Sequence, residues 1–78
     1  MRSRERLIEV LRSVNADVIG KDWFGVLHHA AFLLTAKIPN ADTADLEMTI
    51  AFHHSPHVRE LAGEAIHYLR EDAHADQG

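Results

Sequence analysis

The residues that decide the fold run from Ser55 to Leu69 and read Ser-Pro-His-Val-Arg-Glu-Leu-Ala-Gly-Glu-Ala-Ile-His-Tyr-Leu. Ser55 is suited to cap a helix with its hydroxyl group, and Pro56 suits the first helical position, where no amide hydrogen is needed. The apolar residues that follow recur on one helical face, and they are Val58, Leu61, Ala62, Ala65 and Leu69. This stretch predicts a helix over about residues 56–71 that packs against other helices.

A first helix is predicted upstream, where Ser3 precedes apolar residues at helical spacing, namely Leu7, Leu11, Val14 and Val18. The pattern carries this helix to about Ile19, after which Gly20 offers the left-handed position that ends many helices. An alternative end lies one turn earlier, at Asn15.

A second helix is predicted from a cap at Asp22 to about Ile38, because the residue before Pro39 is pushed out of helical geometry. Apolar side chains cover well over half of its circumference, so we expect it to be covered on more than one side. The remaining stripe places a phenylalanine among histidines and consists of Gly25, His28, His29, Phe32 and Ala36. We expect a partner surface at this stripe, since a chain this small has few elements left to bury it.

The third element is ambiguous. Leu46, Met48, Ile50 and Phe52 alternate with other residues, which is also typical of a half-buried strand. A helix over about residues 43–53 is favoured, because Asp42 or Thr43 provides a cap and a single strand has no partner within the chain. A strand remains the alternative, because a dimer would supply a partner strand.

The predicted fold class is therefore all-α, with about four short helices arranged as two antiparallel helical hairpins in a single domain of residues 1–78. Residues 72–78 have no apolar anchor, and we expect them to form a disordered tail. A chain of 78 residues without cysteine is near the lower size limit for a self-sufficient core. We therefore expect a homodimer or a subunit of a hetero-complex.

The pattern Val58-Arg59-x-x-Ala62-x-x-Ala65-Ile66-x-x-Leu69, preceded by Ser55-Pro56, resembles the second helix of a HEAT-like repeat. The resemblance covers residues 43–71 at most, and it implies that residues 43–53 form the first helix of one repeat. His53-His54 departs from the usual turn, and residues 1–38 do not repeat the motif. Repeat arrays usually need about three units for stability, so the resemblance implies at most a two-hairpin fragment of that architecture.

Charge is distributed unevenly along the chain. The net charge is −4; residues 1–39 carry six basic and four acidic side chains, whereas residues 40–78 carry two basic and eight acidic ones. An acidic surface disfavours direct binding of nucleic acid and favours a protein partner with a basic surface, although it also serves solubility.

Seven histidines raise the question of a metal site, above all at His53, His54 and His57. Two histidines four residues apart share a metal only on a continuous helix, and Ser55-Pro56 interrupts the helix between them. Alternatively, a turn could bring the three histidines together, and Asp45 or Glu60 would then complete a metal site. We expect no metal and no cofactor.

The sequence offers no glycine-rich phosphate loop and no nucleophile elbow, and its carboxylates sit at helix starts and on polar faces, so we expect no enzymatic activity. The charged N-terminus does not resemble a secretory signal, and the uncharged run from Trp23 to Ala36 is too short to span a bilayer. We expect a cytoplasmic protein that does not insert into membranes.

The main functional hypothesis is a protein-binding regulator or inhibitor that acts through the acidic surface and the histidine and phenylalanine stripe. Small acidic proteins of phages and mobile elements often block host defence or transcription complexes in an anti-CRISPR-like manner, which is an analogy. The alternative is a metal-binding protein that uses the His53, His54 and His57 cluster. The predicted partner-binding residues are His28, His29, Phe32, Asp42, Asp45, Glu47, Glu60 and Glu64.

Overall fold

A computed structural model describes residues 1–75, which form five helices and no strand. The helices are α1 (Arg4–Arg12), α2 (Ala16–Ile19), α3 (Lys21–Ala36), α4 (Ala44–Phe52) and α5 (Pro56–Ala75). The all-α prediction is confirmed, and residues 46–52 are helical, which overrules the strand alternative. The last residues of the predicted tail, 76–78, lie outside the described part of the chain.

The first predicted helix is in fact two, because polar side chains interrupt it. Ser3 caps α1 as expected, its Oγ accepting a hydrogen bond from the amide of Arg6 at 3.2 Å. At the end of α1, the hydroxyl group of Ser13 donates a hydrogen bond to the carbonyl oxygen of Glu9. At the start of α2, the side chain of Asn15 accepts a hydrogen bond from the amide of Asp17 at 2.8 Å. Short polar side chains that bond the nearby backbone compete with helix continuation in this way.

Helix α3 begins at Lys21 with Gly20 as its N-cap, so the predicted cap at Asp22 is wrong by two residues, and Asp22 lies in the first turn of the helix. Gly20 has a φ of 97° and joins α2 to α3 as a single residue. A residue with a β-carbon is strained there, and this carbon would lie 3.2 Å from the ring of Trp23. Lys37, in the left-handed conformation, ends α3.

A local cap starts α5, and a long-range contact holds its C-terminal part. Ser55 Oγ accepts from the amide of Val58 at 3.4 Å, in keeping with its predicted capping role. The helix continues past the predicted end at residue 71, because Arg4 donates two hydrogen bonds to the carboxylate of Asp72. The contact reaches across 68 residues of sequence, which no local pattern encodes.

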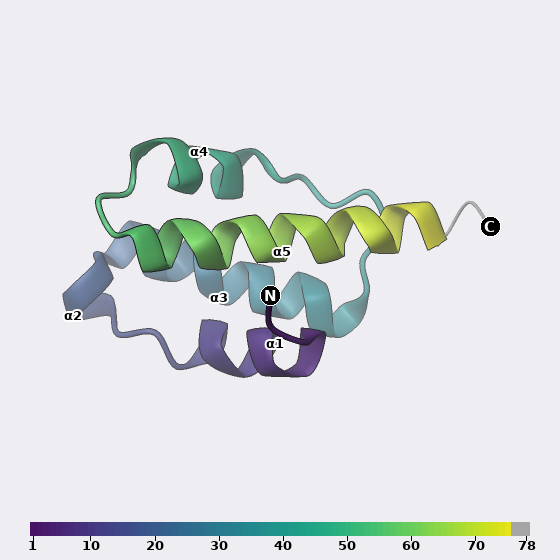
Figure 1. The fold of residues 1–78 in the computed structure, drawn as a ribbon, viewed down its shortest axis with the longest axis horizontal. Coiled ribbons are helices and arrows are strands. Elements are labelled where there is room, and N and C mark those ends of the chain that lie inside the picture. The colour runs from purple at the N-terminus through teal and green to yellow at the C-terminus, as the bar shows by residue number, and fades with distance from the viewer. Residues whose placement is uncertain (76–78) are drawn as a thin grey trace.

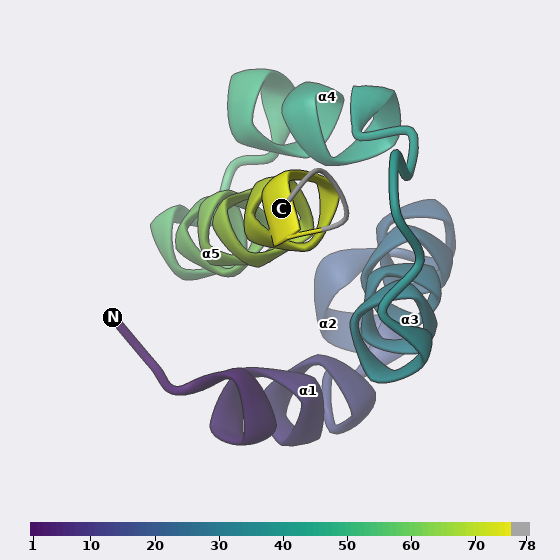
Figure 2. The same cartoon turned by 90° about the vertical axis from the view of Figure 1, so that its right-hand side faces the viewer.

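The helices pair as two antiparallel hairpins, α1 with α3 and α4 with α5 (Figure 1). Helices α3 and α5 run side by side along the long axis of the molecule. Figure 2, which looks along that axis, shows α4 on one side of this pair and α1 on the other. Surfaces on α4 and on α1 are therefore well separated.

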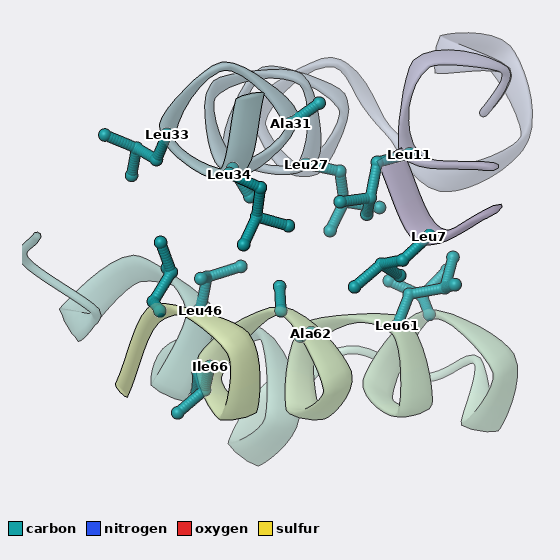
Figure 3. Packing of buried hydrophobic residues seen from close by; sticks show 14 of the residues in the cluster. Leu7, Leu11, Leu27, Ala31, Leu33, Leu34, Leu46, Leu61, Ala62 and Ile66 are labelled. Atoms are coloured by element: carbon teal, nitrogen blue, oxygen red, sulfur yellow. The ribbon is translucent and has the colours of Figure 1, made fainter. Parts of the chain in front are cut away.

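The core lies where the two hairpins face each other (Figure 3). Leucines from α1 and α3 meet Leu46 of α4 and the alanine-lined face of α5, whose Ala62 and Ala65 are fully buried. Small residues let the helices approach closely, which is the packing that the α5 pattern predicts. The fully buried large side chains are Leu7, Leu11, Leu27, Leu34, Leu61 and Thr49.

Candidate functional site

The outer face of α4 exposes large apolar side chains. Met48 and Phe52 lie four residues apart on one helical face and are 51% and 73% exposed. On the neighbouring α3, Phe32 is 58% exposed. Met48 and Phe52, one helical turn apart, indicate an interaction surface on α4 more strongly than a single exposed apolar side chain does.

A groove runs between α3 and α4, and Met48 forms part of its wall. It consists of two adjoining hollows of about 270 and 280 Å³, which share Asp22, Val26 and Asp45. Its apolar lining is supplied by both helices and comprises Trp23, Val26, Ala30, Leu33, Leu46 and Met48. Gly25 lies in the wall of the first hollow, where its missing side chain leaves the α3 backbone bare.

Three carboxylates border the groove, namely those of Asp22, Asp42 and Asp45. All three residues are exposed, and no ion pair within residues 1–75 involves them. Asp42 accepts a hydrogen bond from the amide of Ala44 at 2.8 Å, which fixes the start of α4, and its second oxygen remains for other contacts. The groove thus combines an apolar floor with a negative rim.

Four of the predicted partner-binding residues lie at this surface. Asp42, Asp45 and His29 line the first hollow. Phe32 lies one turn further along α3, and its ring stacks on that of His29 with a centroid separation of 6.1 Å. We call these residues, together with the groove lining, Met48 and Phe52, the α3/α4 surface.

The other predicted residues lie elsewhere. His28 is half-buried, its ring centroid 4.0 Å from that of Phe24, and its Nε2 atom is buried without a hydrogen-bond partner. Glu64 is buried and ion-paired with Arg2 at 2.5 Å, so it serves the fold. Glu60 lies 3.7 Å from the same guanidinium group, and Glu47 lies 3.6 Å from Arg70.

The three clustered histidines do not converge. His53 is buried, and both of its ring nitrogens contact the main chain: Nδ1 accepts from the amide of Ser55 and Nε2 lies 3.0 Å from the carbonyl oxygen of Ile19. His54 is exposed and stacks on His53, while His57 lines a different groove. Within residues 1–75, no three histidine or carboxylate side chains are placed to share a metal ion.

That different groove lies between α1, α2 and the start of α5 and has a volume of about 310 Å³. Its wall is formed mainly by aliphatic side chains, including Val10, Val14, Val18 and Val58. Arg6 is its charged residue, and it already pairs with Glu9 at 2.7 Å. The sequence predicted Val14 and Val18 on the apolar face of one continuous helix; in the structure Val14 lies between the core and this groove, and Val18 is 72% exposed beside it.

Sequence reasoning also missed Asp22 and Met48 as members of the α3/α4 surface. The signal was present in the alternation of apolar residues from Leu46 to Phe52. Once such an alternating segment is helical, Leu46 and Ile50 lie on one face and Met48 and Phe52 on nearly the opposite face, so a helix that packs on one side leaves one of the two pairs exposed. Leu46 is buried in the core, so Met48 and Phe52 form the exposed pair.

Comparison of the chain with protein-family models, with curated proteins and with solved structures gave no match. The chain is an all-helical small domain for which no family or repeat is identified. None of the helices in residues 1–75 has both the length and the apolar composition that a membrane span requires.

Proposed function

We propose that this chain is a non-enzymatic, protein-binding regulator or inhibitor that recognises its partner through the α3/α4 surface. The observation that carries the proposal is the combination of three features on α3 and α4: an apolar groove, the exposed side chains of Phe32, Met48 and Phe52, and a rim of three carboxylates that form no ion pair within residues 1–75. Protein interfaces combine an apolar centre with a polar rim in the same way.

The rim favours a partner with a basic surface. Basic protein surfaces often bind nucleic acid, so an acidic protein that covers one would compete with the nucleic acid for it. By analogy with small acidic phage proteins, the partner that we propose is a component of a host defence or transcription complex.

The predicted homodimer is the competing occupant of this surface. A two-fold axis through the α3/α4 surface would bring the same carboxylates of both copies together. Like charges at such short range oppose association, which favours a hetero-complex. The resemblance of the α4–α5 hairpin to one HEAT-like unit fits this proposal, because helical repeats present extended protein-binding surfaces.

Site-specific cross-linking in the native host tests the proposal. A photoreactive amino acid at position 48 is compared with one at position 9, because Glu9 is exposed on α1, on the opposite side of the molecule (Figure 2). We expect a protein adduct from position 48 that position 9 does not give. The identified protein, once purified, must bind the wild-type chain and lose affinity for the Asp22→Asn, Asp45→Asn double variant. Equal adducts from both positions would contradict the proposal.

A further inference from the structure

We propose that the partner enters the α3/α4 groove as an amphipathic α-helix that carries lysine or arginine beside its apolar stripe. The inference rests on the proposed function and adds to it the shape and the charge of the segment that binds. One feature of the fold and two of the groove support it.

The first feature is the absence of any strand among residues 1–75, which leaves no sheet edge to which an extended peptide would hydrogen-bond. A helix satisfies its own backbone groups and needs only side-chain contacts, which an apolar groove between two helices provides. Along α3 the lining runs from Trp23 to Leu33, and ten residues at 1.5 Å per residue give about 15 Å, or roughly three helical turns.

The second feature is Gly25, in the interior of α3. Glycine lowers the stability of a helix relative to alanine, so a mid-helix glycine usually has a local reason. Nothing in the fold requires it here, because a β-carbon at position 25 would have no neighbour within 4 Å. Its bare backbone lies in the groove wall, where it would let another helix approach closely, as small residues do at helix crossings.

The third feature is charge. Asp22 and Asp45 border both hollows, and Asp42 adds a third carboxylate at the first. A helix lying in the groove would therefore place its flanking side chains among these carboxylates, and lysine or arginine at those positions is complementary. The same carboxylates oppose a second copy of this acidic chain.

Synthetic peptides of about four helical turns test the inference. One carries leucine on one face with flanking lysines, the second replaces each lysine by glutamate, and the third has the lysine peptide's composition in scrambled order. Trp23 is the single tryptophan of the chain and lines the groove, so its fluorescence reports binding. Amide chemical shifts of the labelled protein report where each peptide binds.

The matched variants are Asp22→Asn with Asp45→Asn and, as the control, Glu5→Gln with Asp17→Asn. All four acidic residues lie in the first turn of a helix, so both double variants remove the same charge from equivalent positions. We expect the lysine peptide alone to shift the amides of Val26 and Leu33. Loss of the rim carboxylates weakens its binding about threefold to tenfold, whereas the control binds as wild type does.

Four results would overturn the inference: no binding, equal binding of the glutamate or scrambled peptide, shifts at Val10 and Val14 in place of the α3/α4 groove, or self-association of the wild-type chain through the groove. The cross-linking experiment separates this failure from failure of the proposed function. An adduct from position 48 without selective lysine-peptide binding contradicts only the basic helix, whereas absence of the adduct contradicts partner recognition itself.

Discussion

The imidazole of His53 caps the last carbonyl of α2, with Nε2 lying 3.0 Å from the carbonyl oxygen of Ile19. Because Nδ1 accepts from the amide of Ser55 at 3.0 Å, Nε2 is the ring nitrogen that donates to Ile19. The ring also meets Trp23 edge-on at 5.4 Å. One side chain thus joins α2, α3 and the α4–α5 turn.

His53→Ala should lower the free energy of unfolding by about 2 to 3 kcal/mol, because it removes two hydrogen bonds and leaves a cavity beside Trp23. Urea unfolding measures the change. The exposed neighbour provides the control, and His54→Ala should stay within about 0.5 kcal/mol of wild type. Equal losses for the two variants would show that the contact with Ile19 does not stabilise the fold.

Excess Zn²⁺ should leave the unfolding temperature unchanged, since both nitrogens of His53 already contact the main chain. Thermal unfolding with and without the metal checks this for wild type and for the His54→Ala, His57→Ala double variant. A zinc-induced rise in wild type that the double variant loses would instead support the metal-binding alternative.

Glu64→Gln should destabilise the protein by about 1 to 3 kcal/mol, because the buried carboxylate accepts from both the main-chain amide and the guanidinium group of Arg2. Glu60 is the matched control on the same helix: its side chain is 62% exposed, against 6% for Glu64, and it lies 3.7 Å from Arg2. Glu60→Gln should change stability by less than about 0.5 kcal/mol in the same urea titration. A reversed order would contradict the ion-pair assignment.

Two glycine-to-alanine substitutions should change the stability of the protein in opposite directions. Gly20→Ala forces a β-carbon into a positive-φ position next to Trp23 and should destabilise the protein by about 1 kcal/mol or more. Gly63→Ala fits within α5, where the new carbon lies 4.0 Å from Ile50, and should stabilise it by up to about 1 kcal/mol. Calorimetric unfolding temperatures should fall for the first and rise for the second. The same sign for both would refute the backbone argument.

Local signals made α5 predictable, because Ser55, Pro56 and the apolar period act within a few residues of each other. The break in the helix after Arg12 was harder to predict from the sequence. Val14 and Val18 continue the helical period, while the competing bonds of Ser13 and Asn15 interrupt it. The extension of α5 depends on Arg4 and Asp72, a pair that only the folded topology brings together.

The candidate site was predictable only in part for the same reason. The stripe on α3 pointed to His29 and Phe32, and the acidic half pointed to Asp42 and Asp45. That these residues border one groove depends on how α4 packs beside α3. Glu64 was indistinguishable from a surface acid, because its partner Arg2 comes from the other end of the chain.

The most direct test of the α3/α4 groove compares Gly25→Leu with Gly63→Ala for unfolding temperature and for affinity toward the lysine peptide. Leucine at position 25 meets no neighbour at its β-carbon and raises helix propensity, so the variant should be at least as stable as wild type. Its side chain occupies the groove wall, so affinity should fall about tenfold or more, while Gly63→Ala binds normally. A stable Gly25→Leu protein with wild-type affinity would contradict the α3/α4 groove as the binding site.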